Sequence, residues 1–379
     1  MKIGIITMHK VLNYGSALQA YALQRMVSGL GYDCELIDYC ATNTSSCKPS
    51  IKQKFMQFVK DAIIGFADIR KRNRFKHFYE EFFVESLKQY NPKTIKKDVP
   101  VYDVYMVGSD QVWNPRHIHG NSDFLLGFAP DNSLRVSYAS SFATSSISDH
   151  YKSLYAEHLK KFDTITVREQ QGCEIVRELT GKESCAVCDP VLLLEKDDWA
   201  TLSKIGKGVR HKPYILVYIL GYMFNPYPYV DDIVEKVRKL LGLRIVYLVG
   251  RKKDFFRPHS HLDRDSGPLE FLHLIQNASM VITSSFHGAA FSVVLGRPLL
   301  CVVKDKNENG DRLVSLMKEI GCEMSLVNYN EDVNFDTCHI EDYRCREANL
   351  KKYRDYSRGV LSAMLQKCEN EINNSTNGL

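Results

Sequence analysis

The chain has 379 residues, more than a single hydrophobic core usually supports, so its length predicts two domains. A hydrophobic content of 44% and a charged content of 25% are ordinary for a globular protein and exclude a disordered or fibrous chain. The formal net charge of +5 is too small for a dedicated nucleic-acid-binding protein. A strand starts at Lys2 without a signal-peptide pattern, and no apolar run reaches the roughly 18 residues that a membrane-spanning helix needs. We therefore expect a cytoplasmic protein.

The cysteines give no sign of a disulfide framework or a metal site. There are 11 of them, an odd number, and they are scattered along the chain, which is typical of reduced thiols. The one close pair, Cys185 and Cys188, has no second pair and no nearby histidine. We expect buried strand thiols there, and we expect no metal.

Residues 1–195 are predicted to form one domain around a largely parallel sheet. A strand at Lys2–Met8, a helix at Ser16–Leu30 and a strand at Tyr32–Tyr39 make a βαβ unit. In the loop before the helix, Gly15 permits a tight turn and Ser16 can cap the helix, whose free amide groups could receive an anion. A plain connecting loop is the alternative. Further strands are expected at Val101–Gly108, Arg135–Ser140, Thr164–Val167 and Ala186–Leu194.

A basic segment at residues 48–88 interrupts this domain. From Lys48 to His77 it has nine Lys or Arg residues against two acids, Asp61 and Asp68, and its apolar residues recur close to every 3.6 positions. We expect a basic amphipathic helix. Such a helix lies on an anionic membrane surface or near an anionic lipid-linked acceptor, or it packs its apolar face on its own domain.

A polar stretch at Glu195–Lys212 separates the two halves. Residues 213–340 again alternate strands and helices and are predicted to form a second domain. Its strands are expected at Tyr214–Leu220, Arg244–Val249, Met280–Thr283 and Pro298–Val303. A helical tail, Asp342–Cys368, lies within a closing segment at 341–372 that we expect to return across the domain junction. The pattern predicts an α/β protein of two facing Rossmann-like, doubly wound domains with a cleft between them.

His287 is the most informative candidate for a functional residue. In open α/β sheets, ligands bind beyond the carboxyl ends of the strands. Here an apolar strand ends in Ser284 and Ser285, and a helix opens at His287 and Gly288. The helix-start amides can bind an anion, and the imidazole can bind it as a cation or transfer a proton. A histidine that only caps the helix is the alternative.

Two more candidates follow strands of the first half. Arg168 is suited to bidentate pairing with a carboxylate or phosphate; its alternative is an ion pair with Glu169 or Asp189. Asp110 is the most plausible base, because Gly108 and Ser109 leave room around it. Gln111, Trp113 and Asn114 could bind a sugar, although Trp113 could also simply pack against Pro115.

Six segments of the chain together resemble the polysaccharide pyruvyl transferase family. They are Asn13-Tyr14-Gly15 before a Leu-Gln-Ala-Tyr-Ala-Leu helix, residues 108–114 (GSDQVWN), 137–142 (SYASSF), 167–169 (VRE), 189–193 (DPVLL) and 283–288 (TSSFHG). The resemblance implies a GT-B-like fold, phosphoenolpyruvate as donor, and pyruvate ketals on a surface polysaccharide. It also implies that Arg168 and His287 hold phosphoenolpyruvate.

The resemblance leads to a set of expected roles. Ketal formation needs a proton for the methylene carbon of phosphoenolpyruvate, a base for a sugar hydroxyl, and cations for the phosphate. We expect His287 as general acid and phosphate ligand, Arg168 on the carboxylate or phosphate, and Asp110 as base. The first domain is expected on the acceptor side and the second on the donor side. Donor-binding residues would be Arg168, Ser284, Ser285, His287 and Gly288; acceptor-binding residues would be Asn13, Tyr14, Gly15, Ser109, Gln111, Trp113 and Asn114.

Phosphoenolpyruvate is then a co-substrate, and no cofactor is expected. The acceptor sugar is free, nucleotide-linked or linked to polyprenyl diphosphate. Two other functions remain open from the sequence: a glycosyltransferase of the same architecture that uses a nucleotide sugar, and a non-catalytic glycan-binding protein.

Overall fold

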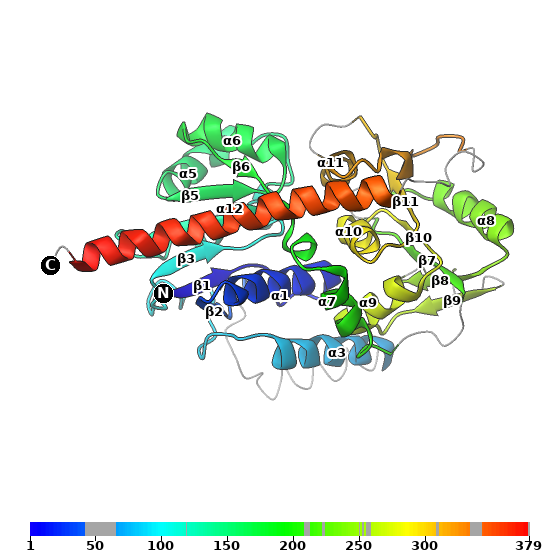
Figure 1. Cartoon of the computed structure of the whole chain (residues 1–379), viewed down its shortest axis with the longest axis horizontal. Coiled ribbons are helices and arrows are strands. Elements are labelled where there is room, and N and C mark those ends of the chain that lie inside the picture. The colour runs from blue at the N-terminus through cyan, green and yellow to red at the C-terminus, as the bar shows by residue number, and fades with distance from the viewer. Residues whose placement is uncertain are drawn as a thin grey trace. The chain divides into compact units, whose positions relative to one another are not determined.

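The structure is a computed structural model that describes residues 1–41, 66–118, 120–207, 213–221, 224–249, 251, 254, 259–307, 311–333 and 343–377. Its contacts divide the chain into two compact units. Unit 1 comprises Met1–Pro49, Glu81–Leu193 and Lys352–Leu379; unit 2 comprises Ser50–Glu80 and Leu194–Lys351. The chain thus enters unit 2 twice, and Figure 1 shows the elements of both units.

Unit 1 is built on a parallel sheet of six strands in the order β2-β1-β3-β4-β5-β6. The strands are β1 (Lys2–Ile6), β2 (Asp33–Leu36), β3 (Val104–Val107), β4 (Leu134–Ser140), β5 (Thr164–Val167) and β6 (Cys185–Ala186). The longer connecting helices are α1 (Tyr14–Gly29), α5 (Asp149–Leu159) and α6 (Gln170–Thr180), and shorter ones are α4 (Pro115–Ile118), η1 (Asp123–Leu125) and η2 (Pro190–Leu192). The strand order reverses between β1 and β3, so the switch point of this sheet lies between their carboxyl ends.

Unit 2 has the same kind of sheet, in the order β12-β11-β10-β7-β8-β9, again with parallel pairs throughout. The strands are β7 (Tyr214–Tyr218), β8 (Arg244–Leu248), β9 (Ser260–Asp263), β10 (Met280–Thr283), β11 (Leu299–Val303) and β12 (Leu326–Asn328). The helices are α7 (Lys196–Ser203), α8 (Tyr229–Leu241), α9 (Pro268–Asn277), α10 (Phe286–Val294), α11 (Arg312–Glu319) and η4 (Glu323–Ser325). Here the order reverses between β7 and β10.

Two such sheets confirm the predicted pair of Rossmann-like domains. The central strands are buried on both faces, as parallel strands covered by helices must be: β3, β7, β10 and β11 have no residue in contact with much solvent. Their runs of Val, Ile and Leu supplied the sequence signal. The expected cleft between the domains stays a prediction.

The structure corrects the predicted strand Ala186–Leu194. Its strand is only β6, Cys185–Ala186, and the apolar residues that follow form η2. The reason is local: Pro190 has no amide hydrogen to give to a sheet, and the Asp189 side chain accepts from Val191 N at 3.1 Å to start a helical turn.

Two other elements differ from the sequence interpretation. The polar stretch at Glu195–Lys212 contains α7, whose Glu195 and Asp198 form a capping box and whose Trp199 is fully buried. The closing helix is longer than expected: α12 runs over Tyr343–Asn377, and its residues from Lys352 onward belong to unit 1.

Residues 48–65 of the predicted basic segment lie outside the described residues. The described part is α3 (Phe66–Phe82), most of which groups with unit 2 rather than with the first domain. Arg70 Nε donates to Asp265 Oδ2 at 2.5 Å, and Arg74 Nη1 donates to Asp265 O at 2.9 Å, while Phe75 and Phe78 are fully buried. This part of the segment therefore packs on its own fold. Among the described residues, no helix combines the length and apolarity that crossing a bilayer requires.

Candidate active site

The segment Thr283–Gly288 lies at the switch point of the unit 2 sheet, where β10 passes into α10. Thr283 Oγ1 donates to Tyr218 O at 2.6 Å, and the Ser284 hydroxyl donates to Leu220 O at 3.1 Å and accepts from Leu220 N at 2.9 Å. Both hydroxyl side chains thus tie the end of β10 to the end of β7. Ser285 is the N-cap of α10, and its side chain accepts from Gly288 N at 3.3 Å.

His287 occupies the first turn of α10 and is 8% exposed. Its ring meets the Phe286 ring edge-on at a centroid distance of 5.1 Å, and the Arg312 guanidinium lies 5.9 Å from the centre of that same phenyl ring. The start of α10 therefore places an imidazole at the carboxyl end of the sheet, and the guanidinium of Arg312, from α11, lies near the adjoining Phe286 ring. Sequence reasoning missed Arg312, because it follows β11 rather than β10.

Position 288 has no room for a side chain. A Cβ atom at this position would lie 2.5 Å from Thr283 Oγ1 and 3.0 Å from Tyr218 Cδ1. Glycine lets the first turn of α10 approach the ends of β7 and β10 closely, which fixes the place of His287. The segment Thr283–Gly288 contains no acidic residue.

In unit 1, Asp110 lies at the corresponding switch point, between the ends of β1 and β3. Asn13 is the N-cap of α1 and accepts from Gly15 N at 2.9 Å and Ser16 N at 3.3 Å. Ser16 Oγ donates to Asp110 Oδ2, and Gln111 N donates to Asp110 Oδ1 at 2.8 Å. The carboxylate is thus held by the start of α1 and by its own turn.

Backbone strain gathers at this edge of the sheet. Asp110 has φ 78°, Ala139 has φ 51° and Ala143 has φ 50°, all in the left-handed region that non-glycine residues avoid at a cost of about 1–2 kcal/mol each. Such conformations persist only where the surrounding contacts fix them, and they concentrate at functional sites. This supports a functional role for Asp110.

Arg168 is buried in a group of carboxylates. Its side chain is 2% exposed, and its Nη1 donates to Asp189 Oδ2 at 2.6 Å, while its Nε lies 4.0 Å from Glu169 Oε2. Burial would lower the pKa of the Arg168 guanidinium, but nearby carboxylates raise it by more, so the net shift of the pKa is upward. These carboxylates are Asp189, Glu169 and Asp110. The ion pair that was the alternative for Arg168 is therefore present.

The expected acceptor-binding residues are not equally placed to meet a sugar. Asn13 and Gln111 are partly exposed, and Asn114 Nδ2 donates to Gln111 Oε1 at 2.8 Å. Trp113 is fully buried, donates its Nε1 hydrogen to Phe124 O at 2.8 Å and packs against Phe142. Its expected sugar contact does not fit this placement, because both the ring and its donor are used in the core. Tyr14, Gly15 and Ser109 are also buried.

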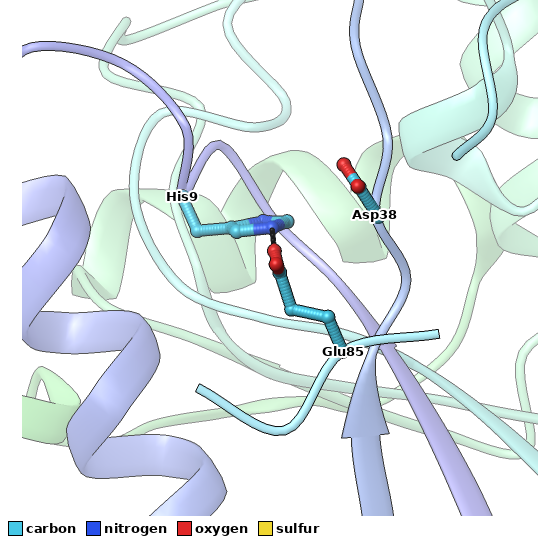
Figure 2. A group of neighbouring side chains, drawn as sticks. All are labelled: His9, Asp38 and Glu85. Carbon is cyan, nitrogen blue, oxygen red and sulfur yellow. Dashed lines mark hydrogen bonds and ion pairs between the residues drawn. The ribbon is translucent and has the colours of Figure 1, made fainter. Parts of the chain in front are cut away.

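A separate polar cluster was not expected from the sequence. The side chains of His9, Asp38 and Glu85 point toward one another from three segments of unit 1 (Figure 2), with candidate ligand atoms within 4.8 Å of one another. Lys10 Nζ, however, lies 2.7 Å from Asp38 Oδ2 and 3.0 Å from Glu85 Oε1. A divalent ion would have to displace this ammonium group, so we interpret the cluster as an ion-pair network.

The fold and the sites can now be compared with known proteins. The chain resembles the structures of a putative UDP-N-acetylglucosamine 2-epimerase from Listeria monocytogenes (TM-score 0.50, 11% identity, covering 96% of this chain and 90% of that one) and an α,α-trehalose 6-phosphate synthase from Burkholderia multivorans (TM-score 0.53, 9% identity, 99% and 98%). At such identities the likeness shows a shared fold alone. No curated protein matches the chain significantly in sequence.

The sequence model of one family matches most of the chain, over residues 13–305. This range contains the turn into α1, the strained Asp110 turn, the Arg168 ion pair and the start of α10. The chain belongs to the polysaccharide pyruvyl transferase family.

Proposed function

We propose that the protein transfers the pyruvyl unit of phosphoenolpyruvate to two hydroxyl groups of a sugar in a surface polysaccharide or its precursor, forming a ketal and releasing phosphate. Family membership supports the reaction class. The single observation that carries the assignment of sites is the contrast in charge between the two switch points.

The unit 2 switch point suits the anionic donor. The start of α10 offers helix-end amides and the positive end of the helix dipole, His287 adds an imidazole, and Arg312 adds a guanidinium near Phe286. We assign phosphoenolpyruvate to this segment, with Ser284, Ser285 and Gly288 shaping it.

The unit 1 switch point suits a neutral polyol. One arginine there faces the carboxylates of Asp110, Glu169 and Asp189, so the local charge repels a phosphate. A sugar hydroxyl meets no such repulsion, and a carboxylate can accept its proton. Donor contact by Arg168 stays a prediction, whereas Asp110 and partly exposed Asn13 and Gln111 fit the acceptor role.

The reaction follows from these roles. His287 gives a proton to the methylene carbon of phosphoenolpyruvate, and the cationic C2 atom is attacked by one sugar hydroxyl, whose proton passes to Asp110. The second hydroxyl then bonds to C2, the bond from C2 to the phosphate oxygen breaks, and the departing proton returns to His287. Two hydroxyl protons are thus released: one restores the proton that His287 gave to the methylene carbon, and the other passes from Asp110 to solvent. Inorganic phosphate is the leaving group.

Donor use is tested directly. The protein is incubated with phosphoenolpyruvate and a panel of galactose- and mannose-type acceptors, and products are analysed by mass spectrometry together with phosphate release. A product heavier by pyruvate minus one water supports the proposal. Transfer of a sugar from a nucleotide sugar, with no use of phosphoenolpyruvate, would establish the glycosyltransferase alternative; binding of glycan without any turnover would establish the non-catalytic one.

The role of His287 has its own test. His287→Gln keeps a hydrogen-bond donor but loses the titrating proton, so turnover at saturating phosphoenolpyruvate should fall by about 10²–10⁴-fold if it is the general acid. A residue that only binds phosphate would mainly raise the donor KM. His261→Gln is the matched control, because His261 is exposed on β9. Parental kinetics in a folded His287→Gln protein would leave the residue as a helix-start cap.

The nature of the acceptor carrier is also a proposal. A polyprenyl-diphosphate carrier would bring the sugar to an anionic membrane surface, where the basic segment at 48–88 could bind. In α3, Arg70 and Arg74 already pair with Asp265. Lys76 pairs with Glu80 at 3.4 Å, but both side chains of that pair are exposed to solvent, so it holds Lys76 only weakly. Charge reversal at Lys76 is therefore the cleaner test, and salt-sensitive loss of binding to anionic vesicles is the expected result.

A further inference from the structure

We propose that Arg168, Glu169 and Asp189 form a buried frame that positions Asp110, and that α12 holds this frame in place. Glu169 and Asp189 would then act through Asp110 rather than on the substrates, with Arg168 between them. The inference rests on the proposed function, in which Asp110 receives the hydroxyl proton.

Asp189 fixes the turn that contains Asp110. Ser109 Oγ contacts Asp189 Oδ2 at 3.2 Å and Ala139 O at 2.9 Å, and Ser109 is fully buried. The next residue is Asp110, with its left-handed backbone. Because Ser109 is hydrogen-bonded to the buried Asp189 carboxylate, this contact fixes the backbone direction of the turn that follows β3 and carries Asp110.

Glu169 fixes the neighbouring turn. Its Oε1 atom accepts from Ser141 Oγ at 2.8 Å, from Phe142 N at 3.1 Å and from Ala143 N at 3.2 Å. Ala143 is another strained residue of this edge, with φ 50°. This turn also contacts Asp110 directly, because Ser141 N donates to Asp110 O at 3.0 Å.

Arg168 joins the two anchors. Its guanidinium pairs with Asp189 and lies 4.0 Å from Glu169, and all three side chains are almost completely buried. Two carboxylates at this depth would repel each other without the cation between them. Arg168 thus allows two acids to lie close together: Asp189 holds the turn at Ser109, and Glu169 holds the turn at Ser141–Ala143.

One face of α12 secures the segment that carries Asp189. Arg354 Nε donates to Leu192 O at 2.6 Å, Arg358 Nε donates to Leu193 O at 2.9 Å, and Cys188 N donates to Ser357 Oγ at 2.9 Å. The spacing of residues 354, 357 and 358 places them on the same side of a helix. The arginines satisfy carbonyl groups at the end of η2 that its short helix leaves open.

The test uses conservative changes that keep the shape of each group. Glu169→Gln keeps an acceptor oxygen but loses the charge next to Arg168, and Ser357→Ala removes only the hydrogen bond to Cys188 N. Ser362→Ala is the matched control, because Ser362 is exposed on the same helix. Both test variants should lower kcat by about tenfold while the KM for phosphoenolpyruvate changes less than about twofold. A misplacement of about 1 Å can cost about 10²-fold in rate, and these conservative changes should cause a smaller one. Ser362→Ala should match the parent.

A double-mutant comparison separates positioning from other roles. In an Asp110→Asn background, Ser357→Ala should cause no further loss of turnover, because the residue that it positions no longer acts as a base. Full additivity would overturn the inference, as would a raised donor KM at unchanged kcat. If Glu169→Gln fails to fold, Ser357→Ala still decides the question. Absence of phosphoenolpyruvate turnover by the parent would refute the proposed function and this inference with it, whereas parental turnover with unaffected variants would refute the inference alone.

Discussion

Arg168 distinguishes two interpretations of the site most sharply, so its substitution makes the strongest prediction. Replacing Arg168 by Met removes the cation from a buried ion pair with Asp189 and leaves that carboxylate buried next to Glu169. Removing one partner of such a pair typically costs about 3–5 kcal/mol. For a domain of this size, each kcal/mol lowers Tm by about 2–4 °C, so the unfolding transition should move down by about 6–20 °C.

Arg168→Lys gives the graded version of the same experiment. Lysine keeps the charge but loses the planar two-pronged geometry, and the loss of one charge-assisted hydrogen bond corresponds to about 1.5–3 kcal/mol. Calorimetry measures the unfolding transitions, and steady-state kinetics on the folded fraction measure kcat and the KM for phosphoenolpyruvate. The expected result is a lowered Tm and a lowered kcat at nearly unchanged donor KM.

A surface ion pair on α8 provides the control for Arg168→Lys. Arg238→Lys on α8 changes a mostly surface pair with Glu235 and should barely move Tm, because such pairs contribute little. A parental Tm for Arg168→Lys together with a donor KM raised ten- to a hundredfold would refute the ion-pair interpretation. Arg168 would then be the donor ligand that the family resemblance implied.

Three further outcomes follow from other contacts. Gly288→Ala should lower both Tm and kcat, since its Cβ would lie 2.5 Å from Thr283 Oγ1; melting curves and kinetics measure this. Although burial raises the pKa of Glu85, contacts with His9 and Lys10 lower it overall, so its stabilising effect is present above the ordinary value of 4.5 and is lost as pH falls further. Glu85→Gln should therefore flatten the acid side of the Tm-versus-pH curve. Burial raises the pKa of Cys188 to about 12, so mass spectrometry should find it unalkylated in the native protein at pH 8.

Much of the fold could be predicted because its strands are continuous apolar runs. Val, Ile and Leu runs such as Met280–Thr283 can only be buried, and glycines and polar loops mark their ends. The same rule failed in the predicted strand Ala186–Leu194, although its apolar run Val191–Leu194 is as long as Met280–Thr283. There a single Pro190 and the capping carboxylate of Asp189 bend the chain into η2. Apolar character predicted burial correctly but could not distinguish a strand from a helical turn.

The candidate site could be predicted only in part. Which residue follows a strand can be read from the neighbouring sequence, but which distant residue forms a hydrogen bond with it cannot. Sequence alone placed Asp110, Arg168 and His287 after their strands. It could not show that Ser16 donates to Asp110, 94 positions away, or that Ser357 supports the Asp189 segment from α12. Trp113 illustrates the same limit, because an aromatic residue in a loop after a strand can face either solvent or the core. Its contacts with Phe142 and Phe124 O, which the sequence does not reveal, place it in the core.

The proposed reaction would place opposite electrostatic demands on the two switch points. Phosphoenolpyruvate brings several negative charges and needs cations and amide groups at its phosphate, whereas a sugar hydroxyl needs a carboxylate that stays ionised. A carboxylate placed at the start of α10 would repel the phosphate of the proposed donor. Thr283–Gly288 has no acid, while Asp110 lies in a group whose cation, Arg168, is itself paired with Asp189. In the proposed reaction, the acid-free segment of unit 2 therefore receives the donor phosphate, and Asp110 of unit 1 receives the hydroxyl proton.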